Sequence, residues 1–169
     1  MRTCLTVILG CTLALASAVA DVDVRDADVD MYPPGTVYDP AIPTPEQFLG
    51  HPLGDAPVRH HELVDYIKQV AGLSDRLSLE VIGYTHERRP ILFLVGTSPE
   101  NHARLDTIRA EHVALTEPGG TERLRDDMPG VTWINFGVHG AEASGMDASL
   151  PFVYHLAAAQ GDEIERILD

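Results

Sequence analysis

Residues 131–145 read VTWINFGVHGAEASG, and this stretch decides how the chain is interpreted. Its first part, Val131 to Phe136, is mostly apolar and β-branched, which is typical of a buried strand. A loop follows from Gly137, in which Glu142 comes three residues after His139. A tight turn can bring this imidazole and this carboxylate to one point, and both are good zinc ligands. Because sites in open α/β sheets lie at the carboxyl ends of strands, the pattern predicts a zinc site at His139 and Glu142.

Small residues surround this pair. Gly137, Gly140 and Gly145 offer the backbone freedom that such a turn needs. Their neighbours Ala141, Ala143 and Ser144 leave room for a substrate. The alternative is a loop that carries a histidine and a glutamate by chance, since a bare His-x-x-Glu pattern is common.

Helix and strand patterns along the chain indicate the fold class. Apolar spacing predicts helices over 60–71, from Pro99 to about 115, from about 146, and over 163–168. Strands are predicted at 77–81 and 91–95, joined as a hairpin by a turn over 83–89, and at 131–136. This order predicts an α/β domain with a layered mixed sheet flanked by helices. Three strands are few for such a sheet, so we expect it to be incomplete in this chain.

The N-terminus has the pattern of a secretory signal peptide over residues 1–20. Arg2 supplies a positive charge, residues 5–16 are apolar, and Ala18-Val19-Ala20 is a small-residue cleavage site. We therefore expect export to a periplasmic or extracellular compartment, without a membrane association after cleavage. An N-terminal membrane anchor, or a lipoprotein signal ending at Cys11, are the alternatives.

The residues after the signal divide into two regions. An acidic, proline-rich leader over 21–58 is expected to be extended and to lie on the domain rather than in its core. Residues 59–169 are expected to form the N-terminal part of a folded domain.

Charge and cysteine content exclude several functions. The formal net charge of −14 argues against nucleic-acid binding and against docking on anionic lipid, since both need a basic face. The two cysteines, Cys4 and Cys11, lie within the signal. The mature chain therefore has no thiolate ligand or cysteine nucleophile, and His, Asp or Glu must hold any metal.

Three stretches resemble the zinc carboxypeptidases, the carboxypeptidase A-like metallopeptidases. WINFGVHGAEASG, residues 133–145, resembles their metal strand and loop, with His139 and Glu142 on the first two zinc ligands. GYTHERRPILFLVGTS, residues 83–98, resembles their early hairpin, although Arg88 stands where glycine is usual. YDPAIPTPEQFLGHPLG, residues 38–54, resembles an N-terminal extension of some bacterial members.

This resemblance implies a mechanism with one zinc ion and a peptide or protein substrate. Two histidines and a glutamate hold zinc and leave one position open for water, whose pKa the metal lowers. A separate glutamate acts as general base, and an arginine commonly holds the terminal carboxylate of the substrate.

The resemblance places the third ligand, the base and the arginine well downstream of the first two ligands, beyond Asp169. His155 does not replace the third ligand easily, because a helical segment between the two residues would place it about 20 Å along the axis from Glu142, at about 1.5 Å per residue. We therefore expect the chain to be the N-terminal part of a secreted metallocarboxypeptidase, whether as a fragment or as a truncated protein, and to be inactive alone.

Two other functions stay open. The stretch His139-Gly140-Ala141-Glu142 also resembles the His-Gly-x-Glu loop of zinc amidohydrolases of the aspartoacylase and desuccinylase type, although the signal and the prolyl leader disfavour this function. A non-catalytic exported binding module is the third possibility, motivated by the missing third ligand and base.

Overall fold

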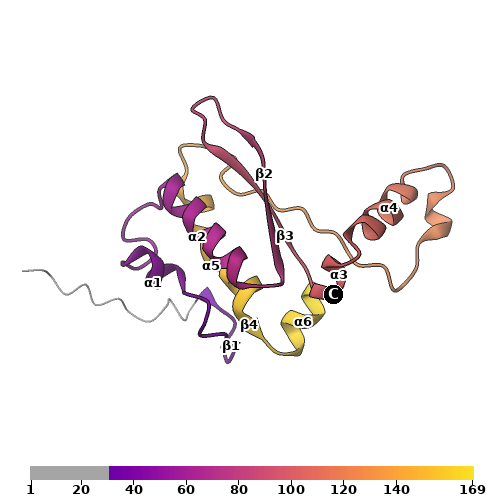
Figure 1. Cartoon of the computed structure of the whole chain (residues 1–169), viewed down its shortest axis with the longest axis horizontal. Coiled ribbons are helices and arrows are strands. Elements are labelled where there is room, and N and C mark those ends of the chain that lie inside the picture. The colour runs from indigo at the N-terminus through magenta and orange to yellow at the C-terminus, as the bar shows by residue number, and fades with distance from the viewer. Residues whose placement is uncertain (1–30) are drawn as a thin grey trace, which may run out of the picture.

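The computed structural model describes residues 31–169. The predicted signal peptide at 1–20 and the first ten residues of the leader lie outside the described residues. Within 31–169 the fold is mixed α/β, with two small antiparallel sheets and several helices (Figure 1). None of the helices in this range is both long and apolar enough to cross a membrane.

The predicted hairpin is confirmed. Strand β2 (Leu77–Tyr84) pairs antiparallel with β3 (Pro90–Gly96), with an irregularity in register between Val81 and Gly83. The turn closes where Thr85 and Arg89 are joined by a 2.8 Å backbone hydrogen bond. At its apex Arg88 has a φ of 61°, the only positive φ of a non-glycine residue among residues 31–169. The turn thus requires a left-handed residue at the position where the sequence departs from the expected glycine.

Helix α2 (His60–Leu73) supplies one side of the core. Its N-terminus is capped by Glu62, whose Oε2 accepts the backbone N–H of Arg59 at 2.8 Å. The helix was predicted over 60–71, with Gly72 as the residue that ends it. The helix instead continues through Gly72 to Leu73, and Ser74 is the C-cap. The helix has one buried face, formed by Val64, Tyr66, Ile67 and Val70.

Helix α5 (Ala143–Ala158) packs against α2 and forms the other side of the core (Figure 1). It begins three residues before the expected position and passes through Pro151 without a break in the assigned helix. Its buried residues include Leu150, Val153 and Tyr154.

A second sheet joins the two ends of the described chain. Strand β1 (Val37–Tyr38) pairs antiparallel with β4 (Ala159–Gln160), which directly follows α5. The predicted final helix is confirmed as α6 (Asp162–Leu168).

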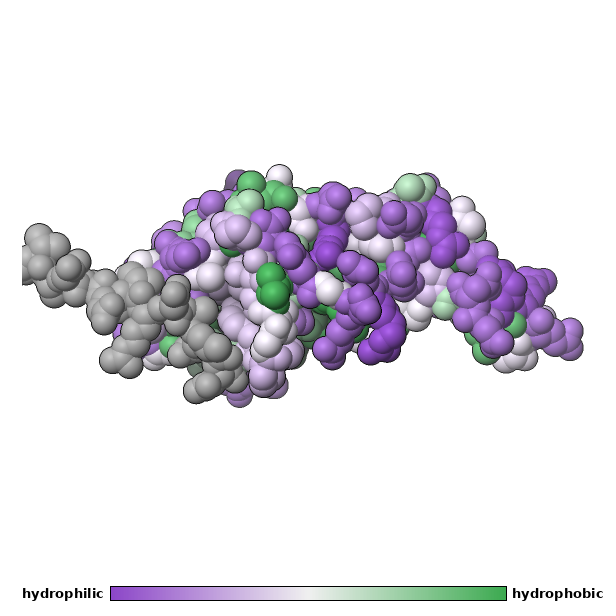
Figure 2. All heavy atoms as spheres, turned by 90° about the horizontal axis from the view of Figure 1, so that it is seen from below, coloured by the Kyte–Doolittle hydropathy of each residue, from purple (hydrophilic) through white to green (hydrophobic). Residues whose placement is uncertain are grey.

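The helix expected from Pro99 to about 115 is divided in two. Helix α3 (Pro99–His102) is followed by α4 (Leu105–Leu115), with Arg104 outside the helical region as the N-cap of α4. A short 3-10 helix, η2 (Gly120–Arg123), follows α4. These elements extend away from the α2–α5 core (Figure 1), and Figure 2 shows mainly hydrophilic residues over this end.

The leader is more buried than we expected. It contains helix α1 (Pro45–Leu49), which begins with a capping box at Thr44. Ile42 and Val58 belong to the hydrophobic core rather than lying on it. Apolar side chains between the prolines therefore bury against α2 and α5, and the Tyr66 hydroxyl donates to Pro43 O at 3.0 Å.

The prediction of a third strand at 131–136 is wrong for this structure. The segment has no strand assignment, and Val131 and Trp133 are 69% and 66% exposed. Trp133 lies beside β3, with its ring centroid 5.5 Å from that of Phe93. Within residues 31–169, however, no backbone forms a ladder with this segment, and a strand needs such a partner. In the described part of the chain the mixed sheet that we expected is therefore not formed, and the two sheets there are antiparallel.

Candidate metal site

His139 and Glu142 lie at the two ends of one β-turn. The backbone N–H of Glu142 donates to the carbonyl of His139 at 3.1 Å, across Gly140 and Ala141. The Cα atoms at the ends of such a turn lie less than about 7 Å apart. Glu142 is also the N-cap residue of α5, so the helix fixes one end of the turn. Both side chains are exposed and accessible to a ligand from solvent.

The glycines near this turn have different reasons for being glycine. Gly137 has a φ of 68°, a conformation that other residues rarely adopt. At Gly145 the reason is space, because a Cβ there would lie 3.0 Å from the backbone nitrogen of Gly137. Gly140 has no positive φ, and a Cβ added there would meet no atom within 4 Å, so it does not need to be glycine. The expectation that all three glycines supply backbone freedom is thus confirmed only for Gly137.

The segment before the turn rests on α5. The rings of Phe136 and Phe152 pack at a centroid distance of 5.5 Å. A Cβ at Gly137 would lie 3.4 Å from Cγ of Met146. These contacts hold the loop against the helix that carries Glu142, although the loop's outer surface faces solvent.

Two donors do not complete a zinc site. An imidazole nitrogen and a carboxylate oxygen suit zinc, but catalytic zinc is usually held by three protein ligands. Among residues 31–169 no group of three or more His, Cys, Asp or Glu side chains is placed to hold a metal ion. The residues present therefore fit two positions of a zinc site and leave the third ligand to be supplied.

His155 is engaged elsewhere. Its Nδ1 lies 2.8 Å from the hydroxyl of Tyr38, and its ring stacks near Tyr32. Burial lowers the pKa of His155, and the neighbouring Glu163 opposes this effect. The structure thus gives His155 a role in joining β1 to α5, toward the opposite end of the helix from Glu142.

Sequence reasoning missed two polar features. Asp147, on the second turn of α5, accepts a hydrogen bond from the backbone of Val58 in the leader. A small cavity lined by Asp39, Asp75 and Arg76 lies near the C-terminal end of α5. Neither has a local motif, because each joins residues that are far apart in the sequence.

The chain was compared with protein-family models, curated proteins and solved structures, and no match was found in any of them.

Proposed function

We propose that the chain is part of a secreted, zinc-dependent metallocarboxypeptidase, in which His139 and Glu142 are two of the zinc ligands. The observation that carries this proposal is the hydrogen-bonded turn between these two residues at the start of α5. A histidine and a glutamate at the ends of one turn present the donor types that zinc selects.

The proposal gives each local residue a role. The imidazole of His139 and the carboxylate of Glu142 hold the ion, and the small residues Ala141, Ala143 and Ser144 leave space beside it. A bound zinc ion would polarise the carbonyl of the substrate's C-terminal peptide bond and would lower the pKa of the water that hydrolyses it. The third ligand, the general base and an arginine for the terminal carboxylate are expected beyond Asp169.

The test is a zinc titration of the protein, in which the NMR signals of the histidine rings report the binding. We expect weak, saturable binding that shifts the His139 signals and is abolished by His139→Ala and by Glu142→Gln. His61→Ala is the matched control, because His61 is exposed on α2 and far from the turn in sequence. Zinc binding that is unchanged in His139→Ala would exclude this residue as a ligand.

An activity assay tests the need for further residues. We expect the protein ending at Asp169 not to hydrolyse peptides, because two ligands do not close a catalytic site. Metal-dependent peptide hydrolysis by this protein, lost in His139→Ala, would show that the additional residues are not needed. Sequencing the gene past the codon for Asp169 complements the assay, since the proposal requires an open frame that supplies a histidine, a glutamate and an arginine.

A zinc amidohydrolase is the second candidate, favoured by the His-Gly-Ala-Glu order of residues 139–142. Assays of a gene product that includes the downstream residues separate the two enzymes. Turnover of peptides supports the carboxypeptidase, whereas turnover of N-acyl amino acids alone supports the amidohydrolase. A product that binds zinc or peptides without turnover supports the non-catalytic module.

A further inference from the structure

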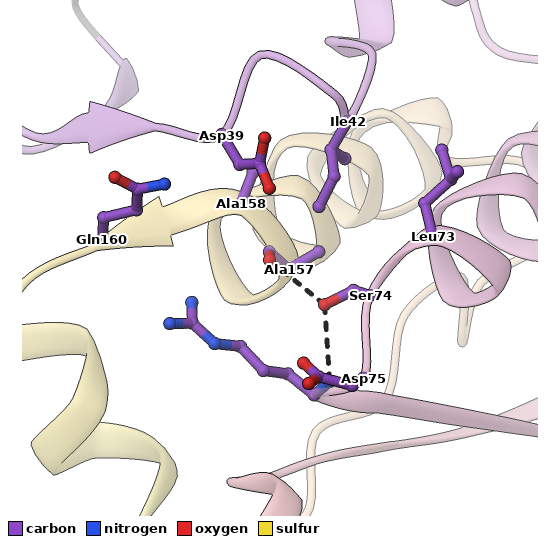
Figure 3. Close-up of a pocket in the computed structure, with 9 residues that line it drawn as sticks. Asp39, Ile42, Leu73, Ser74, Asp75, Ala157, Ala158 and Gln160 are labelled. Carbon is purple, nitrogen blue, oxygen red and sulfur yellow. Dashed lines mark hydrogen bonds between the residues drawn. The ribbon is translucent and has the colours of Figure 1, made fainter.

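A cavity of about 150 Å³ lies where the leader, the end of α2 and the end of α5 meet (Figure 3). It is separate from the metal loop. Ala157 lines the cavity and lies about 20 Å along α5 from Ala143, at about 1.5 Å per residue. Its lining combines charged residues with apolar ones.

Arg76 is fixed in the wall of this cavity. Its Nη1 donates to the carbonyl of Ala159 in β4. Its backbone N–H donates to the hydroxyl of Ser74, which in turn donates to Ala157 O at 3.1 Å (Figure 3). Within residues 31–169 the Nε–Nη2 edge of this guanidinium has no hydrogen-bond partner. That edge has the two parallel N–H donors that bind a carboxylate in bidentate fashion.

Two carboxylates line the same cavity. Asp39 follows β1, and its Oδ1 accepts the backbone N–H of Ala41 at 2.9 Å, which fixes the side chain and leaves Oδ2 available. Figure 3 shows Asp75 on a different side of the cavity from Asp39. Among the described residues, neither carboxylate forms an ion pair with Arg76, although all three residues line one small space. Residues of opposite charge therefore lie around the cavity without being paired with each other.

We propose that this cavity binds a small α-amino acid as its zwitterion. The α-carboxylate pairs with the free edge of Arg76, and the α-ammonium pairs with Oδ2 of Asp39. A cavity of about 150 Å³ has room for a molecule as small as glycine or alanine. Ile42 and Leu73 give the small side chain an apolar surface. A ligand with both charges can pair with Arg76 and with Asp39 at once, whereas a simple anion or a simple cation can pair with only one kind of partner. This proposal does not depend on the proposed zinc chemistry.

Calorimetric titration of the protein tests the proposal with three kinds of probe of similar size. L-Alanine and glycine carry both charges, propionate carries only the carboxylate, and ethylamine carries only the ammonium. We expect saturable binding of glycine or alanine, and binding of propionate and ethylamine that is at least tenfold weaker. Propionate that binds as tightly as alanine would overturn the proposal, as would a folded protein that binds neither amino acid.

Variants locate the site. Arg76→Gln and Asp39→Asn each remove one charge at nearly constant size, and each is expected to weaken amino-acid binding at least tenfold. Asp39→Asn keeps an oxygen that accepts the Ala41 N–H, so it reports on binding even if Arg76→Gln disturbs the fold. The matched controls are Arg109→Gln on α4 and Asp126→Asn in the loop after η2, both exposed and outside the cavity. Unchanged binding in Asp39→Asn, or equal losses in the controls, would place any binding elsewhere and refute the proposal.

Discussion

The backbone N–H of Val58 donates a 2.9 Å hydrogen bond to Oδ1 of Asp147, across 89 positions in the sequence. Val58 is the last buried residue of the leader before α2, and Asp147 lies one turn inside α5. The bond therefore ties the leader to the helix whose first residue follows Glu142.

Removal of this bond should destabilise the protein. We expect Asp147→Ala to lower the free energy of unfolding by about 1–2 kcal/mol, because the buried N–H of Val58 loses its acceptor. Asp147→Asn keeps an oxygen in the same place and should lose less than about 1 kcal/mol. Urea denaturation of both variants measures the difference, and equal losses would show that the charge matters rather than the hydrogen bond.

Replacement of Arg88 by glycine should stabilise the protein. A side chain at a φ of 61° costs about 1 kcal/mol, so Arg88→Gly should raise the free energy of unfolding by about 0.5–1 kcal/mol. The gain is reduced because glycine also has more freedom in the unfolded chain. Arg88→Ala is the control, since alanine keeps the steric cost and should bring no gain. A stabilisation by alanine as large as that by glycine would contradict this explanation.

Glu46 is a second position at which we expect a substitution to stabilise the fold. Its side chain is 1% exposed, and neither carboxylate oxygen has a hydrogen-bond partner among the described residues. Since burying an unpaired acid is costly, Glu46→Met should stabilise the protein by about 1–3 kcal/mol. Thermal unfolding compares this variant with Glu100→Met, which changes an exposed glutamate on α3 and should have little effect. A lower melting temperature in Glu46→Met would mean that the carboxylate has a stabilising partner.

His155 should make stability depend on pH. Burial lowers its pKa in the folded protein below the usual 6.5, so the unfolded chain takes up the proton first as the pH falls. Its stabilising contribution is therefore complete above about pH 6.5 and is lost as the pH falls through the lowered pKa. Unfolding free energies at pH 7 and pH 5 should differ less in His155→Gln than in the wild type. His61→Gln should keep the wild-type difference, and a His155→Gln difference equal to wild type would exclude this residue as the cause.

Gly137 and Gly140, in the loop that carries His139, should respond differently to replacement by alanine. Gly137→Ala places a Cβ on a backbone with a φ of 68° and should cost about 1 kcal/mol of unfolding free energy. Gly140→Ala adds a methyl group in open space at an ordinary φ and should change stability by less than about 0.5 kcal/mol. Denaturant unfolding of both variants checks this, and equal effects would show that the loop adopts another backbone in solution.

Local patterns predicted the elements that depend on local interactions. The alternation at Leu77, Leu79 and Val81 and the apolar run after Pro90 predicted the hairpin, whose strands are neighbours in the sequence. The apolar spacing from Leu63 to Val70 predicted α2. The helix ends were less predictable, because Gly72 is tolerated inside the last turn of α2 when Ser74 supplies the cap.

Features that depend on distant partners were not predictable in this way. Residues 131–136 have the composition of a strand, but composition does not provide the neighbouring strand that a ladder needs. The prolines of the leader indicated an extended chain, but not that Ile42 and Val58 enter the core. For the candidate site, the sequence predicted the pairing of His139 with Glu142 through a short turn, whereas the contact of Gly145 with Gly137 depends on how α5 packs against the loop.

The exposed stretch 131–136 also bears on how the protein behaves in concentrated solution. The stretch has six residues and contains no charge and no proline. Its exposed backbone groups form no ladder within residues 31–169. Segments of this kind associate edge to edge between molecules. A formal net charge of −14 keeps the molecules apart by mutual repulsion. Since physiological salt shortens the range of that repulsion to about 8 Å, added salt should promote self-association, and low ionic strength should keep the protein monodisperse.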